Sequence, residues 1–216
     1  MSSNDRKRGV SWDSRLPVKL QPLPRSFYSP SADVVAPRLL GHWLVRRTPE
    51  GMCGGPIVEL EAYLADDPAC HAFRGETQRN RAMFGEQGRA YVYLIYGYHH
   101  CVNSVYQPQG VGEAVLMRAI EPALGQDLMR QWRPVKRDHE LTNGPAKLCQ
   151  AMKIDRELDG VDLRNADSPL FIAENQALRE FLKRTGPVLK TTRVGITKAA
   201  HLPLRFLLSE SRFVSR

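Results

Sequence analysis

Apolar and polar positions alternate from Val58 to Ala62, in the stretch 57–63 where the chain reads IVELEAY. An alternation with a period of two predicts a β-strand, and it puts Ile57, Glu59, Glu61 and Tyr63 on the same face. Six of the seven tyrosines lie between Tyr63 and Tyr106. Carboxylates in a strand with aromatic residues around them predict a pocket for a flat ligand.

The same periodicities predict the other elements. Strands are expected at 42–47, 90–96, 100–105, 113–120, 169–173, 188–196 and 204–208, and helices at 32–39, 122–132, 146–152 and 175–183. Strands and helices are interspersed without a regular βαβ alternation. We therefore expect an α/β mixed (α+β) fold with a curved, mostly antiparallel sheet, surrounding helices and a protruding β-hairpin. One compact domain is expected to cover 25–216.

The hairpin is formed by the predicted strands 90–96 and 100–105, which are joined through Gly97 and Tyr98. Aromatic side chains gather at this turn, where packing against a core is least available. An aromatic wedge on a hairpin can enter the minor groove of DNA and fill the gap that an extruded nucleotide leaves. A turn that packs on its own domain is the alternative, and the spacing does not choose between them.

Two other segments could face an anionic ligand. Residues 66–88 form a long connection with few periodic apolar positions, and such connections are usually functional or disordered. Its basic residues favour a loop that faces a substrate. Asn143, Gly144 and Pro145 start a predicted helix that carries Lys147. That start could bind a phosphate, or it could be an ordinary capped helix.

Glu61 and Arg118 are the predicted catalytic pair. Arg118 lies among apolar neighbours in the predicted strand 113–120, and an unpaired buried charge is costly. A carboxylate on an exposed strand edge is the simpler interpretation of Glu61. An ion pair with Arg118 would instead hold Glu61 ionised and oriented, as a general base requires.

The composition is that of a globular protein with a basic excess. Of 216 residues, 42% are apolar, and lysine plus arginine outnumber aspartate plus glutamate by 31 to 23, which gives a net charge of +8. This excess favours a polyanionic partner. Residues 1–24 are polar, basic and broken by prolines, so we expect a disordered arm, either a solvated tail or one attracted to phosphates.

Four cysteines without short paired spacing predict neither a zinc site nor a disulfide framework. Reduced thiols indicate an intracellular protein. The chain has no visible signal peptide and no run of about 18 apolar residues that could span a membrane. The histidines at 71, 99 and 100 have no spacing with a carboxylate or cysteine that supports a metal, so no metal and no cofactor is expected.

A series of motifs in fixed order resembles the alkyladenine (3-methyladenine) DNA glycosylase family. The motifs are IVELEAYL, HAFRGETQRN, MFG, YVYLIYG, AVLMRAIEP, NGPAKLCQAM and RVGITKAAHLPLRF. The resemblance is dense from Ser31 to Met152. It implies a hydrolase of DNA base-excision repair that flips alkylated or deaminated purines out of duplex DNA. The N-glycosidic bond is then cleaved by an activated water, which leaves an abasic site.

The resemblance also implies roles for individual residues. Glu61 is the expected general base, and Arg118 positions it. The implied base pocket consists of Tyr63, His71, Tyr93 and Asn103, of which Asn103 screens against normal guanine. Tyr96 is the implied intercalating wedge. Candidates for DNA-backbone contacts are Thr77, Arg79 and Lys147.

The expected partner is therefore double-stranded DNA with damaged purines, with no membrane involved. The expected location is intracellular with the DNA, in the cytoplasm and nucleoid or in a nucleus, and a monomer is the default. Two other functions stay open at this stage. A non-catalytic protein could bind distorted DNA, although Glu61 and Arg118 disfavour it. A hydrolase or transferase could act on small nucleosides, although the basic excess and the hairpin disfavour that.

Overall fold

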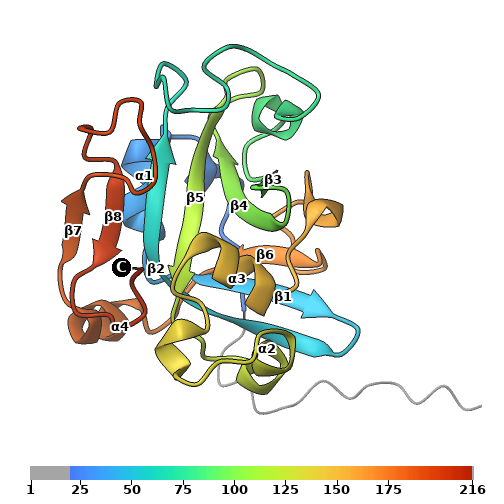
Figure 1. Cartoon of the computed structure of the whole chain (residues 1–216), viewed down its shortest axis with the longest axis vertical. Helices are drawn as coiled ribbons and strands as arrows, with labels where there is room; N and C mark the ends of the chain where they lie inside the picture. The colour runs from blue at the N-terminus through green and yellow to red at the C-terminus, as the bar shows by residue number, and fades with distance from the viewer. Residues whose placement is uncertain (1–19, 216) are drawn as a thin grey trace, which may run out of the picture.

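The computed structural model describes residues 20–215, which form an eight-stranded sheet with helices around it (Figure 1). The spatial order is β3-β4-β5-β2-β1-β6, and β8 pairs with β2 and with β7. All named pairs are antiparallel, and the sheet curls, which confirms the predicted fold class. The strands are β1 (Trp43–Thr48), β2 (Gly51–Tyr63), β3 (Ala90–Ile95), β4 (His99–Tyr106), β5 (Glu113–Ile120), β6 (Leu170–Ala173), β7 (Val188–Thr191) and β8 (Arg205–Leu208).

Helices cover the sheet from both sides. α1 packs against β2 and β5, and α3 packs against β4 and β5 from the other side in Figure 1. The α-helices are α1 (Ala32–Leu39), α2 (Gln126–Trp132), α3 (Pro145–Ala151) and α4 (Leu178–Thr185), and the 3-10 helices are η1 (Arg25–Tyr28), η2 (Arg81–Phe84), η3 (Asp138–Glu140) and η4 (Arg156–Leu158). The core between these layers is one cluster of buried apolar side chains.

The start of α1 shows how a remote side chain completes a helix that the sequence predicts locally. Ser31 is the N-cap residue, but its hydroxyl donates to the carboxylate of Asp33 at 2.6 Å rather than accepting from the backbone. The Ala32 N–H instead donates to Glu113 of β5 at 2.9 Å. A carboxylate at a helix N-terminus is favourable because the free N–H groups and the helix dipole attract negative charge.

β2 is the strand that positions the site. Its first half, 51–56, pairs with β1, and its second half, 57–63, pairs with β5 on one side and partly with β8 on the other. Gly55 permits the close approach of β2 to the segment that follows β5, because a Cβ there would lie 1.8 Å from the carbonyl oxygen of Glu121. One continuous strand therefore carries both glutamates into the centre of the sheet.

The pairing of β2 with β5 shifts its register on both sides of Glu59, which marks a β-bulge. Bulges bend a strand and change the direction of its side chains. Ile57 consequently packs in the main core with Leu60. The prediction that Ile57 shares a face with Glu59 is therefore wrong. Glu61 and Tyr63 keep the common side that the alternation predicted, because they contact each other.

Several expectations from the sequence pattern are wrong at their edges; the predicted helix 122–132, for example, begins only at Gln126. Part of the predicted arm belongs to the domain: Pro22 bridges Ala173 of β6, and Leu23 is buried, because its apolar side chain fills the core beside β6. Residues 1–19 of that arm lie outside the described residues. The predicted strand 188–196 ends at Thr191, and 192–196 is a loop.

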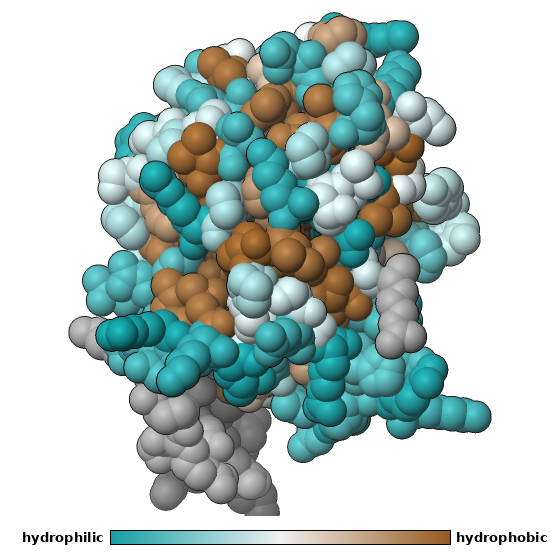
Figure 2. All heavy atoms as spheres, turned by 90° about the vertical axis from the view of Figure 1, so that its left-hand side faces the viewer, coloured by the Kyte–Doolittle hydropathy of each residue, from teal (hydrophilic) through white to brown (hydrophobic). Residues whose placement is uncertain are grey.

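The side of the molecule that carries β7 shows apolar groups separated by hydrophilic ones (Figure 2). β7 is an edge strand that pairs with β8 alone. Its Val188 and Leu189 side chains are exposed, as is Val34 of α1. Among the described residues, no helix is long and apolar enough to cross a membrane.

Candidate active site

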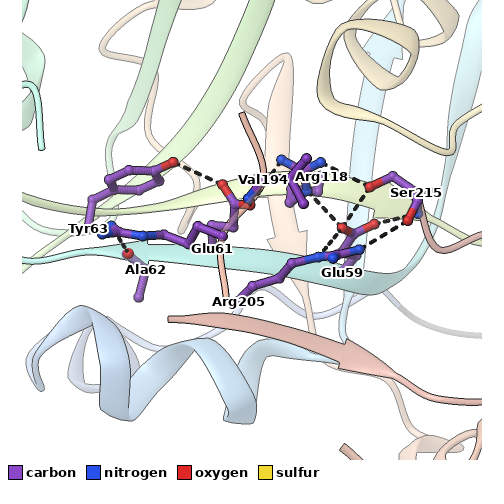
Figure 3. Close-up of polar contacts among 9 residues, drawn as sticks. Glu59, Glu61, Ala62, Tyr63, Arg118, Val194, Arg205 and Ser215 are labelled. Carbon is purple, nitrogen blue, oxygen red and sulfur yellow. Dashed lines mark hydrogen bonds and ion pairs between the residues drawn. The ribbon is translucent and has the colours of Figure 1, made fainter. Parts of the chain in front are cut away.

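Glu61 lies on β2 at the centre of a polar cluster and is fully buried (Figure 3). Its Oε1 accepts from the Val194 N–H at 2.8 Å, and the Arg118 Nη1 lies 3.1 Å away. Its Oε2 accepts from the Tyr63 hydroxyl at 2.9 Å. The predicted ion pair between Glu61 and Arg118 is thus present, and the donors around Glu61 offset the cost of burying its charge.

The protonation states around Glu61 follow from this geometry. Burial raises the pKa of Tyr63, and the charge of Glu61 raises it further, so the phenol stays protonated and donates. Burial works against the charge of Arg118, but Glu61 and Glu59 outweigh it and raise the pKa of the guanidinium. The cluster therefore keeps a donor on each side of the Glu61 carboxylate.

Two adjoining cavities open from this cluster. One has a volume of about 250 Å³ and is lined by Glu61 and Arg118 together with Tyr63, Tyr93 and Tyr96. The other has a volume of about 180 Å³ and is lined by Tyr63, His71, Tyr93 and Asn103, along with Tyr91 and others. Tyr63 and Tyr93 line both. Both cavities are smaller than pockets for drug-sized ligands, which are ~300–1,000 Å³. Their size therefore suits a small flat ring.

The aromatic side chains of the smaller cavity are held by one another. His71 Nδ1 lies 2.9 Å from the Tyr91 hydroxyl, and the His71 ring meets Tyr93 edge-on with centroids 4.6 Å apart. Asn103 donates from Nδ2 to the Tyr91 carbonyl oxygen at 3.0 Å, which fixes its amide. Partial desolvation, and secondarily the charge of Arg79, lower the pKa of His71, so the ring is neutral at pH 7.

The hairpin tip stands in solvent beside the larger cavity. Tyr96 is 75% exposed and Tyr98 is 72% exposed, so the tip does not pack on its own domain. Tyr96 has a φ of 54° and Gly97 a φ of 80°. Asn and Gly are the residues that favour this conformation, and a tyrosine there is strained.

The three candidates for DNA-backbone contacts are exposed on the surface. Arg79 lies with its guanidinium 5.8 Å from the Tyr93 ring centroid and donates to the Leu94 carbonyl oxygen at 3.2 Å. Thr77 donates from its hydroxyl to Asn80 at 2.9 Å. Lys147 of α3 donates to Asn143 at 2.9 Å, one residue after Ala146 of the cavity wall.

Several residues of the cluster were not singled out by the sequence pattern. Val194 lies in the stretch predicted as a strand, and its backbone contacts Glu61. Arg193 is buried with its guanidinium 4.6 Å from the Tyr63 ring centroid, and it pairs with Asp67. Ser215 and Arg205 contact Glu59. A glycine after Val194 is the one local sign of a loop in the RVG segment. Arg193, Arg205 and Ser215 are isolated polar residues, and such residues carry no periodic signal.

A carboxylate buried at the wall of an aromatic cavity, with basic and aromatic groups around the mouth, is typical of a protein that binds a flat ring and performs acid–base chemistry beside it. The chain belongs to the methylpurine-DNA glycosylase family, whose profile matches residues 26–212. It is therefore a DNA glycosylase, a hydrolase of base-excision repair for alkylated bases, and its substrate is DNA inside the cell.

The chain is similar to proteins that bear the name "Putative 3-methyladenine DNA glycosylase". The relative from Methanoculleus marisnigri is 51% identical over 194 residues, which cover 90% of this chain and 98% of the relative. The relative from Carboxydothermus hydrogenoformans is 44% identical with the same two coverages. The relative from Mesorhizobium japonicum is 44% identical over 90% of both chains. These similarities confirm the family resemblance noted in the sequence.

Proposed function

We propose that the protein is a monofunctional purine DNA glycosylase. It flips an alkylated or deaminated purine out of duplex DNA and hydrolyses the N-glycosidic bond with a water activated by Glu61, which leaves an abasic site. The observation that carries this proposal is the position of Glu61, buried at the wall of an aromatic cavity and held by three donors. That geometry favours a base over a structural carboxylate.

Glu61 accepts a proton from the attacking water, whose oxygen bonds to the sugar C1′. The bond between C1′ and the purine nitrogen breaks, and its electron pair leaves with the base. Positive charge builds on the sugar during cleavage, so the carboxylate also stabilises the transition state. Arg118 orients Glu61 in this reaction. In the described part of the chain, neither cavity is lined by a lysine, which supports water rather than an amine as the nucleophile.

Tyr63, His71, Tyr93 and Asn103 select the base. Electron-rich rings attract a cationic alkylated purine, worth about 1–2 kcal/mol when desolvated. A neutral His71 adds no repulsion to such a cation. The Asn103 amide is held in place by Tyr91, and we assign it the role of crowding the exocyclic amine of guanine.

Tyr96 fills the gap that the flipped nucleotide leaves in the duplex, which is consistent with its exposure at the hairpin tip. Thr77, Arg79 and Lys147 contact the DNA backbone. The rival functions considered from the sequence are less well supported. A binding protein without turnover would have no use for a buried Glu61–Arg118 pair, and an enzyme for free nucleosides would have no use for an exposed aromatic tip.

The test is a duplex with a single ethenoadenine, hypoxanthine or methylated purine, followed by hot alkali to cut abasic sites. The wild-type protein excises at least one of these bases and leaves the strand intact before alkali. Glu61→Gln lowers the single-turnover rate by at least ~100-fold, because general-base catalysis contributes about that much or more. Lesion binding stays within roughly threefold, because the amide keeps the shape of the pocket.

Glu50→Gln is the matched control, since Glu50 is half exposed and pairs with Lys153 away from both cavities. It keeps the wild-type rate. Tight lesion binding by the wild-type protein without any excision would establish the binding-protein function instead.

A further inference from the structure

The second buried carboxylate, Glu59, has a denser set of donors than Glu61 although it touches no reacting atom. Its side chain is fully buried, and it is absent from the walls of both cavities. Arg118 Nε and Arg205 Nε each donate to it at 2.7 Å. Ser215 donates twice, from its backbone N–H at 2.6 Å and from its hydroxyl at 2.7 Å (Figure 3).

Ser215 also contacts Arg118 directly. Arg118 Nη2 donates to the Ser215 hydroxyl oxygen at 3.0 Å, while its Nε faces Glu59 and its Nη1 faces Glu61. A guanidinium is planar and holds its N–H groups in a rigid fork. Fixing Nε and Nη2 from one side therefore fixes the direction of Nη1, which is the group that reaches Glu61.

Arg205 completes the balance of charge in this cluster. Two carboxylates, Glu59 and Glu61, face two guanidinium groups, and Arg118 serves both carboxylates. Arg205 also donates to the Ser215 carbonyl oxygen at 3.0 Å, which holds that residue in place. Because Arg205 and Ser215 donate to Glu59, its carboxylate depends less on hydrogen bonds from Arg118.

We propose that Ser215, from the far end of the described chain, is a positioning residue for the glycosylase reaction. It acts through Glu59 and Arg118: by satisfying both it keeps the Nη1 group of Arg118 on Glu61. This inference rests on the proposed role of Glu61 as the base. Strand β2 alone cannot supply that orientation, because Glu59 and Glu61, on either side of a register shift, contact different atoms of Arg118, Nε and Nη1.

Ser215→Ala tests the proposal, because it removes one hydroxyl and leaves the backbone donor to Glu59 in place. Glu59 then draws Arg118 more strongly, and Nη2 loses its acceptor. We expect the single-turnover excision rate at pH 7 to fall roughly 10-fold, the change that loss of one hydrogen bond to a charged group produces. The dissociation constant for lesion DNA stays within about twofold of wild type.

The pH–rate profile separates positioning from simple loss of structure. In Ser215→Ala the positive charge of Arg118 acts less strongly on Glu61, so the acidic limb of the pH–rate profile moves to higher pH, by up to about one unit. Glu59→Gln removes the competing charge, so the limb moves to lower pH. Both variants act on Glu61 through Arg118. The other charged or titratable groups that face Glu61 or share its cavity are Tyr63, Tyr93, Tyr96, His99, Cys101 and Arg193, and neither variant removes a contact of theirs.

Two matched variants complete the experiment. Ser215→Thr keeps the hydroxyl and should restore most of the rate. Ser211→Ala removes a hydroxyl whose one hydrogen bond within residues 20–215 comes from the Phe213 N–H in the same segment, and it should keep the wild-type rate and profile. A wild-type rate and an unmoved limb in Ser215→Ala would overturn the inference, as would equal slowing at every pH that Ser215→Thr does not rescue. Failure of the wild-type protein to excise any lesion would overturn the proposed function instead.

Discussion

At the residue scale, the partners of Glu59 and Glu61 distinguish two equally buried carboxylates. Both lie on β2 and both contact Arg118. Only Glu61 lines a cavity, and only Glu61 accepts from a tyrosine of the pocket. A buried carboxylate surrounded by four protein donors has little capacity left for a substrate proton, whereas one that faces a cavity can meet a water.

His42 is a single residue that should make stability depend on pH. It is buried beside Phe27, and its Nδ1 accepts from the Asn175 N–H at 3.3 Å. Burial lowers the pKa of His42 from 6.5 to about 4. The unfolded chain thus binds the proton first, so the stabilisation is complete above pH 6.5 and is lost as pH falls toward 4.

Urea unfolding at pH 7, 5.5 and 4.5 measures this loss. The wild-type free energy of unfolding should drop by up to roughly 3 kcal/mol from this histidine. His42→Asn keeps an acceptor without a titrating ring, and its pH dependence should be smaller by that amount. Equal slopes for the two proteins would show that His42 does not titrate as its burial implies.

At the element scale, the β3–β4 hairpin combines strain with exposure. Tyr98 N–H donates to the Ile95 carbonyl oxygen at 3.4 Å, so Tyr96 and Gly97 are the central residues of the turn. Both have positive φ, which a tyrosine adopts at a cost of about 1 kcal/mol or more. A strained, solvent-exposed aromatic side chain does not stabilise the fold, so a role in binding explains it better.

Tyr96→Asn should therefore separate stability from function. Asn accepts positive φ more readily, so the free energy of unfolding should rise by roughly 0.5–1 kcal/mol. The same change removes the wedge, so retention of the flipped base should weaken while the chemistry stays. Tyr98→Asn is the control for stability, because Tyr98 is equally exposed and its φ is not positive. A destabilised Tyr96→Asn would contradict the assignment of strain.

The elements that the sequence predicted best are those whose packing follows a simple period. β5 matches its predicted bounds because it is buried along its whole length, and the hairpin matches to within one residue. The Glu61–Arg118 pair was predictable because a buried arginine requires an anion. The loop at 192–196 was not predictable. Its apolar residues Val194 and Ile196 resemble a strand in the sequence, but they line a cavity. The contacts of Ser215 with Glu59, Arg118 and Arg205 join residues far apart in the chain, so they leave no local pattern.

At the scale of the whole molecule, the net charge of +8 does not show which cations can meet DNA. Arg118 and Arg193 are buried with carboxylates, and Arg46 donates to the backbone carbonyl oxygens of Arg47, Lys153 and Pro169. We expect the cations that remain exposed near the cavities, such as Arg79 and Lys147, to supply the attraction. Non-specific affinity should therefore depend on a few positions rather than on the total charge.

The salt dependence of DNA binding tests this distribution. Each phosphate contact contributes about 0.9 to the slope of log K against log salt concentration. Arg79→Ala and Lys147→Ala should each lower the slope by roughly 0.9, for lesion and undamaged duplex alike, since a phosphate contact carries no information about the base. Lys183→Ala on α4 carries the same charge change on an element that lines neither cavity, and it should leave the slope unchanged. Equal slopes for all three variants would mean that a diffuse field, rather than these two contacts, brings the protein to DNA.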